Sequence, residues 1–237
     1  VNIMELAPKG TGKSYVYQKI SKRGWLISGG TVSRASLVYD NVKKTGGLIT
    51  RFDYVGFDEI QSMTFVQPNQ IQTALKDYME FGEVLGFDAQ IVADAGIIVL
   101  GNIDASRFSE DENMMEEVSP VFRESAALDR FHGFIPGWVM PRMNQGLIAK
   151  GWALNTEYFT EVLHLLRDDL NYATIVDECL KLPPKSDQRD YTAIKRLCTA
   201  FVKLIFPNAT CKEDIPVDEF IKYCLEPAKS MRKTIKK

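Results

Sequence analysis

The feature that most constrains the fold is a glycine-rich turn between an apolar stretch and a helix-forming stretch. Residues 1–6 have the pattern of a strand and residues 13–22 that of a helix; the turn between them reads Ala7-Pro8-Lys9-Gly10-Thr11-Gly12-Lys13-Ser14. Gly10 and Gly12 let backbone N–H groups approach an anion closely, and a helix beginning at Lys13 directs its positive end toward the same point. The pattern therefore predicts a site for the phosphates of a nucleotide.

The same turn supplies the side chains that a triphosphate and its metal ion require. We expect Lys13 to reach the β- and γ-phosphates and Ser14 to bind Mg²⁺. Ala7 stands where the strict pattern G-x-x-x-x-G-K-S has glycine, so the alternative is a turn that binds nothing. The segment expected to surround the phosphates is Pro8, Lys9, Gly10, Thr11, Gly12, Lys13, Ser14 and Tyr15.

Two further apolar stretches end in polar side chains that suit this chemistry. Asp58 and Glu59 follow the strand-like residues 54–57, and Asn102 comes shortly after residues 97–100. Because ligands bind at the carboxyl ends of parallel strands, we expect Asp58 to hold Mg²⁺ and Glu59 to orient the attacking water. Asn102 would contact that water or the γ-phosphate. An acidic turn and a Gly-Asn turn are the alternatives.

Up to about residue 143, strand-like and helix-like stretches alternate. We predict helices over residues 33–44 and 68–79 and a hairpin over residues 81–91. Such alternation indicates an α/β fold with a parallel sheet, and the unbroken apolar run at residues 97–100 fits a strand covered on both faces. We therefore predict an α/β domain over residues 1–143.

Beyond that point the apolar residues follow helical spacing. The predicted helices span residues 155–170, 189–206 and 216–225. These helices define an expected second domain over residues 144–237. The basic residues near the end of the chain are expected to form a solvated, partly frayed terminus: Lys229, Arg232, Lys233, Lys236 and Lys237.

Composition argues against several classes of protein. The chain has 29 Lys and Arg against 31 Asp and Glu, a net charge of −2, so no overall positive charge marks a nucleic-acid or anionic membrane surface. No apolar run is long enough to cross a bilayer and the first residues do not resemble a signal peptide, so we expect no membrane contact and a cytoplasmic location. Four cysteines without a C-x-x-C pair, and two histidines, disfavour a zinc site or a disulfide framework.

Three arginines are candidates for a side chain that reaches the phosphates held by a neighbouring subunit. Arg130, in Leu128-Asp129-Arg130-Phe131, is the preferred candidate, and Arg123 and Arg142 are its rivals. Each of them alone is more often part of an ordinary surface ion pair.

Taken in order, these segments resemble the AAA+ ATPases along essentially the whole chain. The resemblance implies a P-loop αβα sandwich with a parallel sheet of order 5-1-4-3-2, followed by a small all-helical lid. It implies ATP and Mg²⁺ as ligands and sites completed between subunits. It also implies that Arg189, at the start of a lid helix, responds to the bound nucleotide.

More narrowly, the chain is similar to the Lon-like ATPases of bacterial BREX phage-defence systems. The segments that carry this likeness are Gly10-Thr11-Gly12-Lys13-Ser14, Trp25-Leu26-Ile27-Ser28-Gly29-Gly30, Phe57-Asp58-Glu59 and Lys76-Asp77-Tyr78-Met79-Glu80-Phe81-Gly82. The hairpin before Asn102 resembles that of MCM-type helicase ATPases. The family implies a ring of identical subunits, hexameric by resemblance, with DNA as the target and other phage-defence components as further partners.

Departures from the family keep other functions open. The hairpin tip Leu85-Gly86-Phe87-Asp88 has no basic residue, which does not support gripping of DNA, and Phe87 is a candidate aromatic pore residue. No segment resembles a Ser–Lys peptidase dyad, so we expect no peptidase activity in this chain. The alternatives are a peptide-threading unfoldase and a nucleotide-dependent assembly scaffold with little hydrolysis, although the intact Asp58-Glu59 pair argues against the scaffold.

Overall fold

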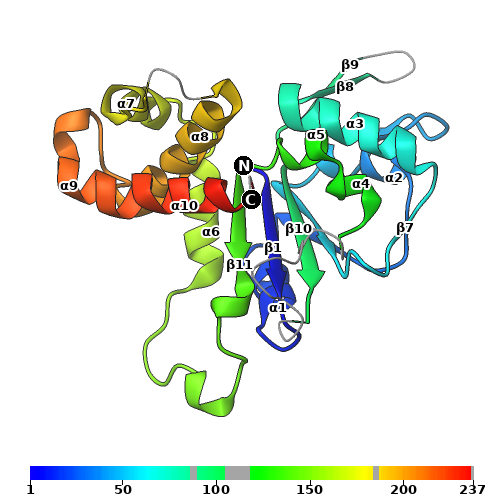
Figure 1. Ribbon diagram of the computed structural model, residues 1–237, viewed down its shortest axis with the longest axis horizontal. Helices are drawn as coiled ribbons and strands as arrows, with labels where there is room; N and C mark the ends of the chain where they lie inside the picture. Colours follow the sequence, from blue (N-terminus) through cyan, green and yellow to red (C-terminus); the bar gives the residue numbers. More distant parts are fainter. Residues whose placement is uncertain (86–89, 105–117, 184–186, 236–237) are drawn as a thin grey trace.

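A five-stranded parallel sheet forms the centre of the computed structural model, which describes residues 1–85, 90–104, 118–183 and 187–235 (Figure 1). The strands are β1 (Ile3–Ala7), β2 (Gly24–Ser28), β6 (Tyr54–Asp58), β10 (Gly96–Asn102) and β11 (Gly133–Pro136). They lie in the order β11-β1-β10-β6-β2, and every neighbouring pair is parallel. Counted along the chain this is 5-1-4-3-2, which confirms the predicted order.

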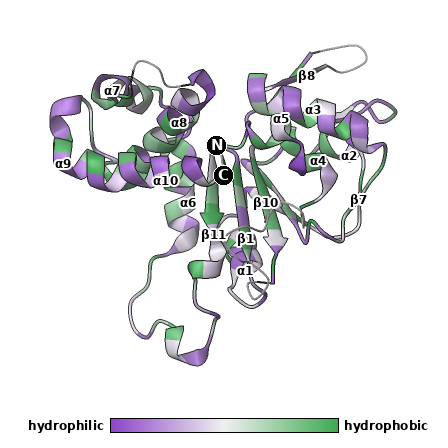
Figure 2. Ribbon diagram, in the orientation of Figure 1, coloured by the Kyte–Doolittle hydropathy of each residue, from purple (hydrophilic) through white to green (hydrophobic). Residues whose placement is uncertain are grey.

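Burial explains why these segments form strands. Six of the seven residues of β10 are buried, as expected for a strand covered on both faces, and Figure 2 shows it as hydrophobic along most of its length. In β1 the side chains alternate between faces: Met4 and Leu6 enter the larger hydrophobic core, whereas Glu5 contacts Tyr17 of helix α1 (Lys13–Lys19). The two faces of the sheet therefore have different partners.

Helix α3 (Pro68–Phe81) covers one face of the sheet, together with α2 (Arg34–Leu37), α4 (Pro120–Arg123) and α5 (Ser125–Leu128) (Figure 1). Proline at its first position and Gly82 in the left-handed region after its last residue, with φ 73°, mark its two ends. Its buried residues recur at helical spacing: Ile71, Ala74, Leu75, Tyr78 and Met79. The predicted helix over 68–79 is confirmed.

Short pairs of strands lie outside the central five-stranded sheet. The parallel pair is β3 (Thr31–Val32) with β7 (Thr64–Phe65), and the antiparallel pairs are β4 (Tyr39–Asp40) with β5 (Thr45–Gly46) and β8 (Glu83–Leu85) with β9 (Gln90–Val92). The last pair confirms the predicted hairpin, whereas its tip with Phe87 lies outside the described residues. A 3₁₀ turn, η1 (Leu48–Thr50), precedes β6.

The predicted helix over residues 33–44 is wrong. The helix that forms there, α2, ends at Leu37, and the chain then enters the β4–β5 pair. The carboxylate of Asp40 accepts hydrogen bonds from the backbone N–H groups of Val42 and Lys43, at 2.9 and 3.0 Å. Such local side-chain bonds stabilise a turn at the expense of a helix.

The later part of the described chain is helical and has a hydrophobic cluster of its own. After the 3₁₀ turns η4 (Gly137–Val139) and η5 (Gln145–Leu147), its helices are α6 (Thr156–Leu165), α7 (Asn171–Cys179), α8 (Gln188–Ile205), the turn η6 (Lys212–Asp214), α9 (Val217–Phe220), the π-helical turn η7 (Ile221–Leu225) and α10 (Glu226–Ile235). A domain boundary at residue 143 stays a prediction. Within the described residues, no helix combines the length and apolar character needed to cross a membrane.

The prediction of a frayed basic terminus is wrong for the residues up to 235. Helix α10 runs to Ile235 and lies beside the start of β11 (Figure 1), where the Met231 side chain covers Gly133. Arg232 is only 2% exposed, and ion pairs with Asp129 and Asp190 satisfy its charge. A basic side chain that is paired with carboxylates in this way can anchor a helix to the rest of the fold, whereas an unpaired one would extend into solvent.

Candidate nucleotide-binding site

The glycine-rich turn has the backbone that phosphate binding requires. Gly10 and Gly12 have φ of 85° and 88°, a left-handed conformation that favours glycine, and Gly12 precedes the first turn of α1. Met143 closes the turn from outside: its N–H donates to the Gly10 carbonyl at 2.8 Å. A Cβ on Gly12 would lie 3.2 Å from Cγ of Met143. The loop is thus shaped for close approach of an anion to backbone N–H groups.

Lys13 joins this turn to the end of β10. Its side chain is buried, and its ammonium group donates a hydrogen bond to Oδ1 of Asn102. Burial lowers the pKa of Lys13, and the nearby carboxylates of Asp58 and Glu5 oppose that shift. The structure therefore brings two of the predicted site residues into direct contact.

Asp58 and Glu59 end the neighbouring strand β6. Asp58 is buried, and its Oδ1 accepts the N–H of Glu59 at 2.9 Å. Glu59 has a left-handed backbone with φ 53°, which is strained for a side chain of this kind, and its side chain is exposed. The sharp turn separates the two carboxylates: one stays within the edge of the sheet, and the other faces solvent.

Two residues that sequence reasoning missed support this edge. The Gln61 side chain bonds to both backbone groups of Asn102, with its Oε1 accepting the Asn102 N–H at 3.3 Å. Glu5, only 4% exposed, accepts the phenol of Tyr17 at 3.0 Å. The sequence could have pointed to Glu5, because an acidic residue inside a predicted buried strand is unusual. No feature of the sequence around Gln61 indicates its role.

Replacing Glu5 by glutamine is expected to stabilise the protein at neutral pH. Burial raises the pKa of Glu5 above its ordinary value of 4.5. The folded state therefore favours the protonated carboxyl of Glu5. The stability that this provides is fully present below pH 4.5 and is lost as pH rises through the raised pKa. Glutamine keeps an acceptor for Tyr17 but never ionises. Thermal unfolding from pH 4 to pH 8 should show an advantage of Glu5→Gln that grows with pH; a difference constant across that range would contradict it.

Arg130 and Arg189 lie near the amino ends of the strands, at the opposite end of the sheet from the glycine-rich turn. Arg130 shortly precedes β11, and its carbonyl is 3.5 Å from the side-chain nitrogen of Asn2, just before β1. Because β1 has five residues, this end is about 17 Å from the glycine-rich turn. The structure therefore does not bring Arg130 or Arg189 to the candidate phosphate site of their own chain.

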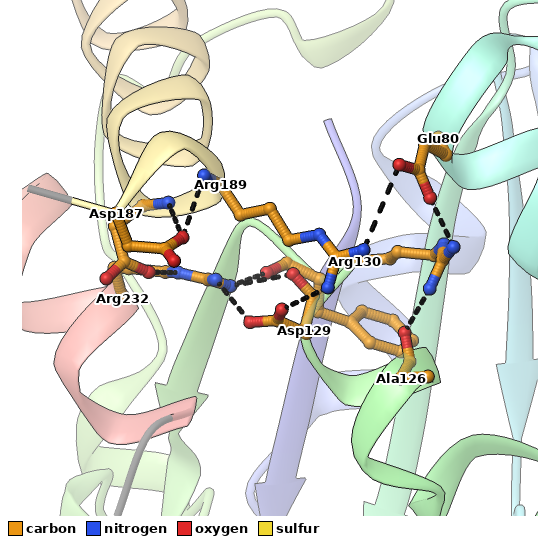
Figure 3. A network of polar contacts seen from close by, with 9 residues as sticks. Glu80, Ala126, Asp129, Arg130, Asp187, Arg189 and Arg232 are labelled. Atoms are coloured by element: carbon orange, nitrogen blue, oxygen red, sulfur yellow. Dashed lines mark hydrogen bonds and ion pairs between the residues drawn. The ribbon is translucent and has the colours of Figure 1, made fainter.

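The two arginines instead lie together in a polar network (Figure 3). Arg130 pairs with Glu80 and donates to the carbonyl of Ala126 at 2.5 Å, while Arg189 donates to Oδ2 of Asp129 at 2.7 Å. Burial tends to raise the pKa of Asp129, but Arg189 and Arg232 outweigh it and hold that pKa below its ordinary value.

The rival arginines occupy other places. Arg142 is exposed and directly precedes Met143, so it lies beside the glycine-rich turn of its own chain. Arg123 is the last residue of α4 and is also exposed.

The donor set fits a nucleotide with its magnesium ion. A hydroxyl at Ser14 in the first turn of α1 and a carboxylate at Asp58 are hard oxygen ligands, which Mg²⁺ prefers together with phosphate oxygens. Lys13 supplies a compensating positive charge, and the N-terminus of α1 adds its dipole.

The sheet order, the loop after β1 and the acidic end of β6 define a P-loop domain of the AAA+ class. Residues 1–237 match the family model described as "Lon-like protease BrxL-like, ATPase domain", and the chain belongs to that family.

Two curated relatives are both named Lon-like protease BrxL. The one from Escherichia coli O9:H4 (strain HS) is 32% identical over 239 residues, and the one from Bacillus cereus (strain H3081.97) is 31% identical over 245 residues. Both matches cover 100% of this chain but only 34% and 35% of the relatives, so the chain spans about a third of their length.

Proposed function

We propose that this chain binds and hydrolyses ATP as the motor module of a Lon-like protein that assembles into a ring. The observation that carries the proposal is the division of the candidate site between two ends of one sheet. Lys13, Asp58 and Asn102 gather at the carboxyl ends of the strands, and Arg130 lies with Arg189 near their amino ends. A head-to-tail arrangement of copies would bring the two halves together.

Each residue has a separate task in this proposal. Lys13 neutralises charge on the β- and γ-phosphates, and Ser14 and Asp58 hold Mg²⁺, which draws charge from the phosphate oxygens. Glu59 orients and polarises the water for in-line attack, and Asn102 positions that water or the γ-phosphate.

Arg130 of the neighbour stabilises the charge that develops in the transition state. The family resemblance implied a lid arginine that responds to bound nucleotide. Because Arg189 lies beside Arg130, we propose that it acts with Arg130 on the neighbour's nucleotide.

The test is the rate of ATP hydrolysis per subunit measured against protein concentration. If sites form between subunits, this specific rate should climb steeply as the protein assembles. Lys13→Ala serves as the blank, since it removes the phosphate-binding charge. A specific rate that stays measurable and constant over the whole concentration range would contradict a shared site.

We propose further that the ring is hexameric and acts on DNA in bacterial phage defence, with other defence components as partners. This part is supported by the family resemblance alone, because the tip of the hairpin between β8 and β9 has no basic residue that could grip DNA. ATP hydrolysis stimulated by DNA and weakened by salt would support it. Stimulation by an unfolded polypeptide alone would favour a threading unfoldase. We assign no peptidase activity to this chain.

A further inference from the structure

We propose that Glu80 is the positioning residue for the arginines that act on the neighbour's nucleotide, and that it couples them to the β8–β9 hairpin. The inference rests on the proposed function, because it takes Arg130 and Arg189 to act in the site of an adjacent subunit. The polar partners that the described residues provide for Glu80 are Arg130 and Arg189, and not the candidate phosphate-site residues Lys13, Asp58 and Asn102.

The two oxygens of one carboxylate serve two arginines (Figure 3). Oε2 of Glu80 pairs with Nη2 of Arg130, and Oε1 lies 3.9 Å from Nη2 of Arg189. The side chains of Arg130 and Glu80 are 15% and 33% exposed, so this pair is better shielded from water than an ordinary surface ion pair. Glu80 therefore holds two like charges side by side that would otherwise repel each other.

Arg130 depends on Glu80 more than Arg189 does. Its Nε is buried and has no hydrogen-bond partner among the described residues, so Glu80 and the carbonyl of Ala126 orient its guanidinium group. Arg189 also pairs with Asp129, which is held in turn by Arg232 at 2.9 Å. Loss of the Glu80 charge should therefore release Arg130 first and separate it from Arg189.

Glu80 is also tied to the hairpin through the end of α3. It lies in the last turn of that helix, two residues before Gly82, whose N–H bonds to the Tyr78 carbonyl at 2.8 Å. The Gly82 carbonyl accepts the Ala93 N–H at 3.0 Å and so closes the base of the hairpin. The phenol of Tyr78 bonds to the Ala95 carbonyl at 2.7 Å. A displacement of the arginine pair is therefore transmitted to the hairpin over a few residues.

A mixture of two inactive variants tests the positioning role. The acceptor carries Arg130→Ala and Arg189→Ala and keeps its phosphate site; the donor carries Lys13→Ala and keeps its arginines. Active sites then form only where an acceptor meets a donor. Glu80→Gln placed in the donor should lower the restored hydrolysis rate by about tenfold or more while KM for ATP stays within about twofold. Placed in the acceptor, it should change neither.

Glu124→Gln is the matched control, because Glu124 pairs with Lys76 one turn earlier on α3, at 2.9 Å. It should leave the restored rate unchanged in either subunit. Equal losses from Glu80→Gln in donor and acceptor would show a merely structural role, and no loss in the donor would also overturn the inference. If the unaltered donor and acceptor restore nothing, the shared site itself is wrong, and the inference falls with it.

Hydrogen exchange tests the coupling to the hairpin. A slowly hydrolysed ATP analogue should change the exchange of backbone amides in β8 and β9 of the assembled protein. Glu80→Gln should abolish that change, and Glu124→Gln should preserve it. A nucleotide response that is absent from the unaltered protein, or that survives in Glu80→Gln, would overturn the coupling.

Discussion

Arg130→Ala is expected to slow ATP hydrolysis by about 10³- to 10⁵-fold and to leave ATP affinity within about threefold of the unaltered protein. The reason is geometric. Arg130 lies near the amino ends of the strands, where it cannot touch the phosphates that its own chain binds. It would contact only the transition state formed at a neighbouring subunit. Steady-state hydrolysis and equilibrium binding of a fluorescent ATP analogue measure the two quantities separately.

Two further variants keep this prediction open to contradiction. Arg130→Lys retains a charge beside Glu80 but loses the forked guanidinium, so it should fold and still hydrolyse slowly. Arg142→Ala removes an exposed arginine beside the chain's own turn and should have little effect on the hydrolysis rate. A loss below tenfold in both Arg130 variants would show that the site needs no arginine from its neighbour.

Local patterns located most of the elements that build the site. The runs at residues 54–57 and 97–100 became β6 and β10 because a strand covered on both faces must be apolar throughout. The order of the strands came from the family resemblance, since pairing between distant segments depends on contacts that no local pattern encodes. The pairing of Ala7 with Asn102 is such a contact.

Where the sequence did not predict the structure correctly, a specific physical cause can be named. Residues 33–44 have an apolar pattern that suits a helix, but the bonds made by Asp40 stabilise a turn instead. Arg232 was indistinguishable from the surrounding lysines until the fold placed Asp129 and Asp190 around it. Likewise, the place of Arg189 beside Arg130 depends on how α8 packs against α10, which in turn contacts β11, and sequence spacing does not determine this packing.

Glu59→Gln is expected to stop turnover while ATP stays bound, with a hydrolysis rate about 10²- to 10⁴-fold below that of the unaltered protein. The Glu59 side chain is exposed, so the fold does not depend on it. Glutamine has the same shape and tolerates the backbone at φ 53° as well as glutamate does. The substitution therefore removes only the negative charge that would polarise the water. Radiolabelled ATP retained on the isolated protein, unhydrolysed, is the measurement.

Asp58→Asn provides the contrast, because its carboxylate is buried at the edge of the sheet and would serve the metal ion instead of the water. That variant should lose the dependence of ATP affinity on Mg²⁺, whereas Glu59→Gln should keep it. The two adjacent carboxylates then differ in the step they control, as their separation by the sharp turn at Glu59 implies. Rapid turnover in Glu59→Gln would assign the water to another group, and Asn102, which already contacts Lys13, would be the next to replace.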